Sequence, residues 1–355
     1  MYSIFSDAKS TWEQQLKDIE NAKSSIYLEQ YILRDFEAGQ IGRQFVDALI
    51  EKAESGVEVR IILDFQGSLD LFKDTELNSK LKDSGLMISY YKTLPITKAF
   101  SPIRIMLRDH RKFLLVDHTI SWIGGVVIGE EFRDWSDLMV RFTDLQLADY
   151  CNREFRRQIQ RLNGGKVILA PLDKVTEEYE LVGNSPGLGN RYCYEQISHQ
   201  IMLAKKQVVI VTPYFAPPLR MRRVIERRLA DGLEITLIIS RRTDNRYADW
   251  SREMFLEKLV PQGLILKYLD YMNHAKLVIV DGSWCTFGST NIDALSLITN
   301  HELNITTRDA NLVNDITAQV TEWSDNCERV QLEDLEFHKM SFTQKLAGKL
   351  LKYFV

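Results

Sequence analysis

One short motif occurs twice in the sequence: a histidine, a lysine two residues later, and an aspartate five residues after the lysine. The copies are His110, Lys112 and Asp117, and His274, Lys276 and Asp281. Side chains two residues apart in a strand point to the same face, so each histidine should project together with its lysine. A lone copy could equally be polar residues at a strand end, but two copies indicate two matching half-sites.

Two imidazoles and two ammonium groups in one cleft suit chemistry at a phosphate diester. One histidine can attack phosphorus while the other protonates the leaving oxygen. The two lysines would offset the charge on the non-bridging phosphate oxygens. With those cations in place the charge count requires no divalent metal, and we expect no metal site and no cofactor.

A carboxylate follows each motif at nearly the same distance. Asp137 lies 27 residues after His110, and Glu302 lies 28 residues after His274. A carboxylate that binds one ring nitrogen of a histidine selects the tautomer and raises the basicity of the other nitrogen. The spacing therefore predicts that Asp137 and Glu302 orient the two histidines, the alternative being ordinary surface charges.

The elements around these residues also occur twice. Helical periodicity alternates with short β-branched runs, which predicts an α/β fold. We expect strands at 25–33, 57–63 and 86–92 in the first half and at 207–213, 233–240 and 264–269 in the second. Helices are expected at 14–22, 41–53 and 75–83, and at 194–204, 221–229 and 252–260. Recurring phrases, such as the one at 56–59 and again at 232–235, indicate a duplicated domain.

Length and composition agree with two domains. The chain has 355 residues, of which 45% are hydrophobic and 26% charged. A net charge of −4 disfavours a dedicated binder of duplex nucleic acid. The four cysteines form no C-x-x-C pair, so we expect no disulfides and a reducing compartment. No stretch approaches 18 consecutive apolar residues and the N-terminus has no apolar segment, so we expect no membrane-spanning helix and no signal peptide.

The doubled motif, with its glycine pair at 124–125 and Gly-Ser at 288–289, resembles the phospholipase D superfamily over nearly the whole chain. The flanking phrases at 31–35, 56–60, 212–215, 288–293 and 300–304 are most similar to the bacterial cardiolipin synthase branch. The resemblance implies two homologous mixed-sheet α/β/α sandwich domains about a pseudo-twofold axis. We place the first half at 1–165, the second at 166–325 and a C-terminal tail at 326–355.

The resemblance also implies roles for individual residues. His110 would be the nucleophile that forms a phosphohistidine and His274 the general acid, although the order could be reversed. Lys112, Lys276 and Asn291 would hold the phosphoryl oxygens. Structural roles would fall to Asp117, Asp281, Gly125 and Ser289. Substrate contacts are expected from Arg104, Arg108, Arg111 and Tyr214.

The first half departs from the pattern at one position. Where the second half has Asn291, the first half has Val127, which has no side-chain donor. Loss of one donor to a developing oxyanion can cost roughly 3 kcal/mol. Either the first half is partly degenerate or a backbone N–H near Gly125 replaces the missing amide. Asp109, directly before the first histidine, is also unusual and could shift the pKa of that histidine.

Two basic segments could contact a membrane. Residues 337–355 carry four lysines and no acid, and apolar residues recur every four positions at 342, 346, 350 and 354. This pattern is typical of an amphipathic helix on an anionic membrane surface, and equally of a helix that closes its own domain. The arginine-rich stretch 220–246 could draw anionic headgroups to the cleft or form a solvated helix face.

By resemblance, the first functional hypothesis is a phosphatidyltransferase that makes cardiolipin and glycerol from phosphatidylglycerol and a second lipid alcohol. Its partners would be anionic phospholipid and the inner face of the cell membrane, with a cytoplasmic, peripheral location. A lipid hydrolase would share the covalent step and differ only in the attacking group. A nuclease could use the same residues but would need a basic groove with aromatic platforms. A degenerate lipid-binding scaffold is suggested only by Val127.

Overall fold

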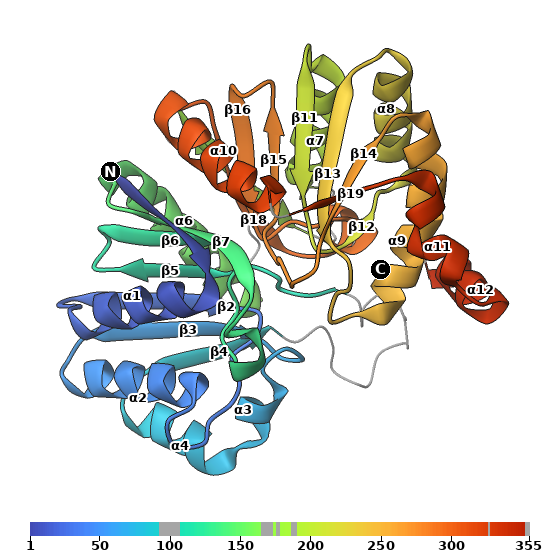
Figure 1. Ribbon diagram of the computed structural model, residues 1–355. Helices are drawn as coiled ribbons and strands as arrows, with labels where there is room; N and C mark the ends of the chain where they lie inside the picture. Colours follow the sequence, from blue (N-terminus) through green and yellow to red (C-terminus); the bar gives the residue numbers. More distant parts are fainter. Residues whose placement is uncertain (92–106, 165–172, 175–177, 186–189, 326, 352–355) are drawn as a thin grey trace.

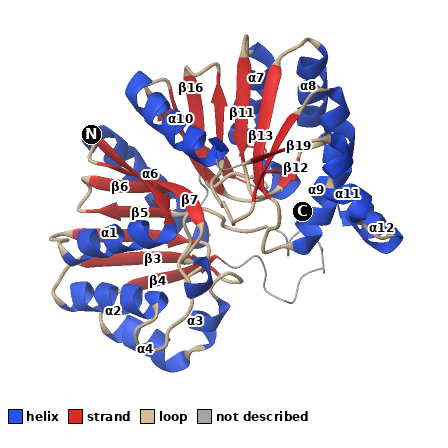
Figure 2. Ribbon diagram, in the orientation of Figure 1, coloured by secondary structure: helices blue, strands red, loops and turns tan. Residues whose placement is uncertain are grey.

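The computed structural model describes residues 1–355 except 92–106, 165–172, 175–177, 186–189, 326 and 352–355. Two large mixed β-sheets with helices packed against them form the two halves of the molecule (Figure 1). Figure 2 shows the strands of both sheets in red, with the helices in blue along their faces. The α/β fold class predicted from the alternating periodicity is confirmed.

The first sheet has seven strands in the order β1-β7-β6-β5-β2-β3-β4. Its strands are β1 (Tyr2–Asp7), β2 (Ser25–Gln30), β3 (Glu58–Asp64), β4 (Met87–Tyr91), β5 (Phe113–Val116), β6 (Ile120–Gly124) and β7 (Ser136–Phe142). The expected strands β2, β3 and β4 run parallel to one another, whereas β5, β6, β7 and β1 are antiparallel. All residues of the central strands β2 and β5 are buried.

The second sheet repeats this order as β9-β18-β16-β15-β11-β13-β14, with β10 and β19 added at its two edges. Its strands are β8 (Asp173–Lys174), β9 (Tyr179–Ser185), β10 (Asn190–Arg191), β11 (Gln207–Val211), β13 (Glu234–Ser240), β14 (Ile265–Leu269), β15 (Leu277–Val280), β16 (Trp284–Gly288), β18 (Glu302–Thr307) and β19 (Glu328–Val330). A small separate pair joins β12 (Phe215–Ala216) to β17 (Ile292–Asp293). The matching strand orders confirm the duplication read from the recurring phrases.

Helices connect the strands in both halves. The first half has α1 (Ala8–Glu20), α2 (Ile41–Glu54), α3 (Leu69–Lys73), α4 (Thr75–Asp83), a 3₁₀ turn (Glu130–Phe132) and α6 (Leu145–Leu162). The second has α7 (Tyr192–Leu203), α8 (Leu219–Ala230), α9 (Arg246–Leu259), a 3₁₀ turn (Val260–Gln262), a π-helical turn (Leu295–Thr299), α10 (Ala310–Asp325), a 3₁₀ turn (Leu332–Asp334), α11 (Glu336–Lys339) and α12 (Phe342–Leu351).

Helix α9 begins six residues before the expected position of 252. Asn245 accounts for the difference, because its side chain accepts hydrogen bonds from the backbone N–H groups of Tyr247 and Ala248. Such a cap satisfies donors that the first turn would otherwise leave free. Helix α1 likewise begins at Ala8, earlier than expected, where Asp7 accepts from Ser10 N.

Three hydrophobic cores hold the elements together. One lies between the first sheet and helices α1, α2 and α4, and a second lies between the second sheet and helices α7, α8 and α9. The third joins the two halves and includes α6 and α10. Across it the rings of Phe142 and Phe287 stack with centroids 6.5 Å apart. The halves therefore share one buried interior and are not two separate globules.

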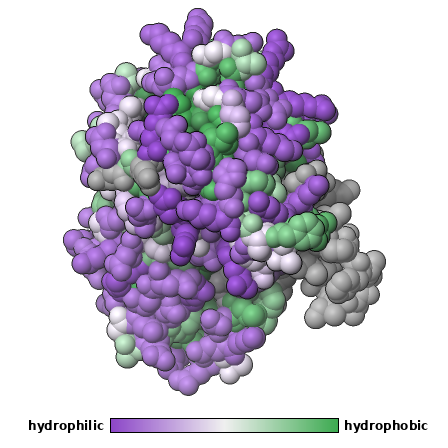
Figure 3. Space-filling view, turned by 45° about the vertical axis from the view of Figure 1, so that its right-hand side comes forward, coloured by the Kyte–Doolittle hydropathy of each residue, from purple (hydrophilic) through white to green (hydrophobic). Residues whose placement is uncertain are grey.

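The predicted tail at 326–355 is not separate from the second half. Strand β19 pairs with β14 and extends the second sheet, and the Leu335 side chain is buried in the core beneath it. Helix α12 then packs on α9. Among the described residues, no helix has the length and apolar character needed to cross a bilayer. The face in Figure 3 is largely hydrophilic, with smaller hydrophobic areas between the polar side chains.

Candidate active site

Both histidines lie in short extended segments that lead into a strand, not within the strand itself. His110 and Lys112 precede β5, and His274 and Lys276 occupy the same place before β15. Lys112 Nζ donates a hydrogen bond to the carbonyl oxygen of His110 at 2.6 Å, and Lys276 Nζ donates to the carbonyl oxygen of His274. Each lysine is therefore tied to the backbone of its own histidine.

Backbone hydrogen bonds join each of these segments to the other half. They run from Ser136 N to Met272 O (3.0 Å), His274 N to Ser136 O (2.7 Å), His301 N to Arg108 O (2.8 Å) and His110 N to His301 O (3.0 Å). Ser136 directly precedes Asp137, and His301 directly precedes Glu302. Each histidine is thus held by backbone bonds beside the predicted carboxylate of the opposite half.

The side chains follow the same crossed arrangement. His274 Nδ1 lies 2.8 Å from Asp137 Oδ2, and His110 Nδ1 lies 3.1 Å from both carboxylate oxygens of Glu302. The structure therefore brings together the four residues that the spacing singled out, but each carboxylate contacts the histidine of the other half. With Nδ1 occupied by the carboxylate, the other ring nitrogen, Nε2, remains for chemistry.

The small residues after each motif make room for these carboxylates. A Cβ on Gly125 would lie 2.2 Å from Asp137 Oδ1. Ser289 Oγ donates to Glu302 Oε2 at 2.5 Å, and Gly288 has φ +155° with no room for a Cβ beside Leu303. The glycine pair and the Gly-Ser pair thus perform the same task in the two halves: each leaves space for, or directly binds, the carboxylate that orients a histidine.

Burial and like charge set the protonation of the site. Burial lowers the pKa of His274 to about 4 and that of His110 below its ordinary value, although each carboxylate opposes the shift. Burial also lowers the pKa of Lys276 to about 8. Burial and the nearby Lys276 ammonium lower the pKa of Lys112. Burial alone would raise the pKa of Asp137, but Lys276 and His274 outweigh it and hold that pKa below its usual value. The free site therefore holds neutral imidazoles beside anionic Asp137 at neutral pH.

The two histidines line one cavity of about 480 Å³. Aromatic side chains form much of its wall, namely Tyr31, Phe132, Trp135 and Tyr214. The Tyr31 ring meets His110 edge-on with centroids 4.9 Å apart, and the Trp135 ring lies 5.3 Å from that of His274. Polar groups from both halves reach the same space, so the cavity is built across the junction of the halves.

Asn291 and Val127 both line this cavity, as their matching sequence positions suggested. The Asn291 side chain donates a hydrogen bond to the Asp293 carboxylate, another group of this cavity, and its side-chain oxygen has no hydrogen-bond partner among the described residues. Val127 presents an apolar side chain, and its carbonyl oxygen accepts a hydrogen bond from Trp12 Nε1 at 2.9 Å. The two matching positions therefore differ, polar at Asn291 and apolar at Val127, although both halves contribute polar side chains to the cavity.

Two of the four predicted substrate contacts line the cavity, one lies outside the described residues, and one is buried elsewhere. Arg108 and Tyr214 line the cavity, and the Tyr214 hydroxyl donates to Asp244 Oδ1 at 2.6 Å. Arg104 lies outside the described residues. For Arg111 the structure corrects the expectation, because this side chain is 1% exposed and does not line the cavity.

Arg111 instead forms a buried ion-pair cluster with three carboxylates. It lies 2.8 Å from Glu29, 3.2 Å from Asp109 and 3.0 Å from Glu154. Burial alone would raise the pKa of Asp109, but the Arg111 charge outweighs it and lowers that pKa to about 2. A guanidinium so placed neutralises buried acids that would otherwise be costly. Arg111 and Asp109 thus support the segment that carries His110.

Asp117 and Asp281, the last residues of the two motifs, lie at the far ends of β5 and β15. Asp117 accepts hydrogen bonds from the backbone N–H groups of Lys23, Ser24 and Ser25. Asp281 does the same for residues 205–207. Both carboxylates brace the turn that enters the next strand of the sheet, and neither lines the cavity.

The cavity also contains side chains that were not predicted, among them Tyr31, Trp135 and Asp244. Tyr31 had a usable signal, since it occupies the same place in the first half as Tyr214 in the second. Trp135 lies two residues before Asp137 and could have been assigned from that neighbour. Asp244 follows β13 in a loop and has no counterpart that its spacing reveals.

Comparisons with known proteins agree with this geometry. The family model described as "Cardiolipin synthase, PLD-like domain" matches residues 16–159 and 197–324, which is more than half of the chain. A cardiolipin synthase of Clostridium perfringens (strain SM101) is 26% identical over 98% of this chain and 75% of its own length. A cardiolipin synthase of Oceanobacillus iheyensis is 29% identical over 88% of this chain and 66% of its own.

A solved structure shares the fold. The phosphatidylserine synthase of Haemophilus influenzae Rd KW20 superposes with a TM-score of 0.78, at 16% identity, over all of this chain and 95% of its own. The resemblance to phospholipase D-type proteins read from the motifs is confirmed. With both motifs meeting in one cavity and the family model covering both halves, the chain belongs to the family of cardiolipin synthases with the phospholipase D-like domain.

Proposed function

We propose that this protein is a phosphatidyltransferase that makes cardiolipin and glycerol from phosphatidylglycerol and a second lipid alcohol. The observation that carries the proposal is the crossed site, in which each histidine is paired with a carboxylate of the other half inside one cavity. Relatives named as cardiolipin synthases, similar over nearly the whole chain, support the substrate class.

The reaction we propose has two transfer steps. Nε2 of His110 attacks phosphorus of phosphatidylglycerol, the P–O bond to the terminal glycerol breaks, and protonated His274 gives its proton to the departing oxygen. His274 then accepts the proton of a lipid alcohol, whose oxygen attacks phosphorus and breaks the P–N bond to His110. The lysines at 112 and 276 and the amide of Asn291 stabilise the negative charge on the non-bridging oxygens.

The pairing of His274 with Asp137 supports its assignment as acid and base. A general acid must be protonated when substrate is bound, yet burial lowers its pKa to about 4 in the free site. The phosphate anion and the Asp137 carboxylate both favour the protonated imidazole, so substrate binding itself would raise the pKa of His274. Binding of the lipid phosphate would thereby favour the protonated form of His274 that the first step requires.

For the location, we propose peripheral attachment to the inner face of the cell membrane. Phosphatidylglycerol resides in a bilayer, and the enzyme must reach its headgroup from the surface. Cations near the cavity, including Arg108, would attract an anionic substrate.

The test is an assay of purified protein with phosphatidylglycerol vesicles, read by mass spectrometry. Cardiolipin with released glycerol is expected, whereas phosphatidic acid alone would identify a hydrolase. Single-stranded DNA is incubated in parallel, and its cleavage would favour the nuclease alternative. A chelator should leave the activity unchanged, because the lysines supply the charge that a metal would otherwise provide.

Alanine variants of the two histidines distinguish the two transfer steps. His274→Ala should accumulate a covalent phospholipid adduct or react only with substrates whose leaving group needs no proton, whereas His110→Ala should form no adduct. An adduct found on His274 in place of His110 would reverse the assigned roles. Full activity in both variants would disprove the mechanism.

A further inference from the structure

Helix α12 packs against α9 through a small residue and leaves its large apolar residues outside. A Cβ on Gly348 would lie 2.4 Å from the Trp250 carbonyl oxygen, so the two helices approach closely there. Phe342, Leu346 and Leu350 recur every four residues and are 81%, 48% and 63% exposed. Three large apolar side chains in a row on one helix form a contiguous patch, which usually marks an interaction site.

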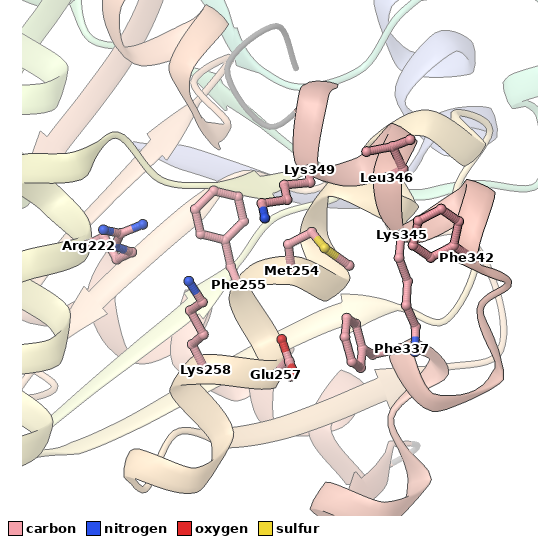
Figure 4. Close-up of a pocket in the computed structure, with 10 residues that line it drawn as sticks. All are labelled: Arg222, Met254, Phe255, Glu257, Lys258, Phe337, Phe342, Lys345, Leu346 and Lys349. Carbon is pink, nitrogen blue, oxygen red and sulfur yellow. The ribbon is translucent and has the colours of Figure 1, made fainter.

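Beside this patch lies a groove between α9 and α12 with a volume of about 510 Å³. Its apolar walls come from Met254, Phe255, Phe337, Phe342 and Leu346. Four cations surround them, namely Arg222, Lys258, Lys345 and Lys349, against the single acid Glu257. Figure 4 shows Lys258 and Lys349 on either side of the Phe255 ring, so charged and apolar groups alternate around the groove.

The cations of the groove have little charge compensation within the protein. Among the described residues, Lys258 and Lys349 have no ion pair. The Lys345 ammonium lies 4.2 Å from the centre of the Phe337 ring, and Arg222 lies 3.4 Å from Glu226. An anionic partner would therefore meet three lysines that this chain leaves largely uncompensated.

Helix α9 connects this groove with the active site. The residue that caps α9, Asn245, lines the catalytic cavity, while Phe255 and Lys258 near the other end line the groove. Fourteen helical residues span about 21 Å. A second hollow of about 380 Å³ lies alongside the same helix. It includes the cations Arg242, Arg246 and Lys339, together with the acids Asp249, Glu253 and Glu336.

We propose that the α12 patch and the α9–α12 groove dock the protein on an anionic phospholipid bilayer. Phe342, Leu346 and Leu350 insert among the lipids, and the surrounding lysines contact lipid phosphates. An apolar patch flanked by cations matches a bilayer interface whose acyl region is apolar and whose surface is anionic. A nucleic acid would use the cations but not the patch, and an apolar protein partner would not need the cations. The inference rests on the proposed function for its choice of lipid.

The first experiment measures sedimentation of the full chain with vesicles of equal parts phosphatidylglycerol and phosphatidylcholine. The variant Phe342→Ser/Leu346→Ser/Leu350→Ser should bind at least about tenfold more weakly, because it loses the inserted apolar area. Lys258→Glu/Lys349→Glu should also bind at least about tenfold more weakly and should lose most of the salt dependence. Wild-type protein should bind vesicles of phosphatidylcholine alone at least about tenfold more weakly.

Matched controls make the same chemical changes elsewhere. Leu145→Ser/Leu203→Ser removes two exposed leucines from α6 and α7, and Lys17→Glu/Lys82→Glu reverses two exposed lysines of the first half. Both should bind within about twofold of wild type. Thermal unfolding of every variant checks that the protein remains folded. Because these side chains are mostly exposed, their loss should change stability little.

Activity on phosphatidylglycerol in detergent micelles separates docking from catalysis. The variant Phe342→Ser/Leu346→Ser/Leu350→Ser on α12 should keep its activity in micelles while it loses vesicle binding. Absence of cardiolipin synthesis in every protein, with the binding differences intact, would overturn the proposed function and leave the docking site standing. Unchanged vesicle binding by the α12 variant, or equal binding to neutral vesicles, would overturn the docking proposal.

Discussion

At the scale of single residues, the crossed contacts of the histidines decide how the site works. Asp137 contacts His274, and Glu302 contacts His110. A carboxylate on Nδ1 leaves Nε2 free to react and stabilises the imidazolium that forms during proton transfer. Since each half supplies the carboxylate for the other, damage to one half should disturb the histidine of the other half.

Asp137→Ala should therefore change the ring-nitrogen NMR shifts of His274 and leave those of His110 nearly unchanged. Activity should fall about 10²- to 10⁴-fold, because the general acid loses the group that orients it. Glu302→Ala should show the reverse pattern. Assignment of the six histidines uses single His→Gln variants, and an Asp137→Ala effect on His110 alone would contradict the crossed pairing.

The lowered pKa of Lys276 predicts an alkaline limit to activity. Burial lowers this pKa to about 8, so Lys276 loses its proton as pH rises through that value, and with it the charge that binds phosphoryl oxygen. The pH profile of kcat/KM should fall above about pH 8. Asp137→Asn should move this limb to lower pH, because the Asp137 carboxylate raises the Lys276 pKa.

The titration of Lys276 should not unfold the protein in the pH range where activity falls. The folded state lowers the Lys276 pKa from an ordinary 10.5, so between about pH 8 and 10.5 the unfolded chain binds the extra proton. The contribution of Lys276 to stability therefore increases with pH across this window. A thermal unfolding curve at each pH checks that the protein stays folded where activity falls; a profile flat up to pH 10 would contradict the assignment.

At the scale of elements, the strand ends and their small residues set the position of the carboxylates. Strand β6 ends at Gly124, and the next residue, Gly125, packs directly on the Asp137 carboxylate. Any side chain at that position must displace the group that orients His274. The glycine is thus required by contact with the carboxylate beside His274, since its φ is not in the left-handed region.

Gly125→Ala should reduce kcat about 10²-fold or more, with a smaller effect on KM, because the carboxylate moves while the rest of the cavity stays. Gly183→Ala is the matched control. It lies in β9 beside the backbone of Glu302, but its added Cβ would meet the nearest atom at an ordinary 3.5 Å. Normal activity of Gly125→Ala would show that Asp137 is not held where the structure places it.

At the scale of the whole molecule, the shared interior makes the two halves one cooperative unit. The core between the halves contains residues of both sheets together with α6 and α10. The stacked rings of Phe142 and Phe287 lie within it and belong to different halves. Separation of the halves would expose this core and remove the carboxylate partner of each histidine, so neither half should be active alone.

Phe287→Ala should therefore destabilise both halves together, by about 3–5 kcal/mol. Denaturant unfolding followed by circular dichroism and by tryptophan fluorescence should give coincident transitions, because the six tryptophans are divided equally between the two halves. Phe342→Ala, at a site 81% exposed, should change stability by less than about 0.5 kcal/mol. Two separated transitions in wild-type protein would show that the halves unfold independently.

Local sequence was sufficient for much of the fold and of the site. The parallel strands, most of the helices between them, the duplication and the doubled motif all depend on periodicity and on short spacings, which a chain displays directly. The strands β1 and β9 and the helices α6 and α10 were not predicted. Strands β1 and β9 each pair with a strand more than 100 positions away along the chain, a partner that only the tertiary structure selects. Helix α6 repeats its buried residues with helical spacing, so the sequence did carry a signal for it.

The sequence by itself singled out the residues that we propose for the chemistry, because two histidines with their lysines and carboxylates are recognised by residue type and by repetition. Only the tertiary structure decided how they are paired. It assigned Asp137 to His274 and Glu302 to His110, buried Arg111 among acids, and placed the apolar patch of α12 outside. The physical reason is that these contacts join residues more than 40 positions apart or depend on which helix face a neighbour covers. No spacing along the chain encodes them.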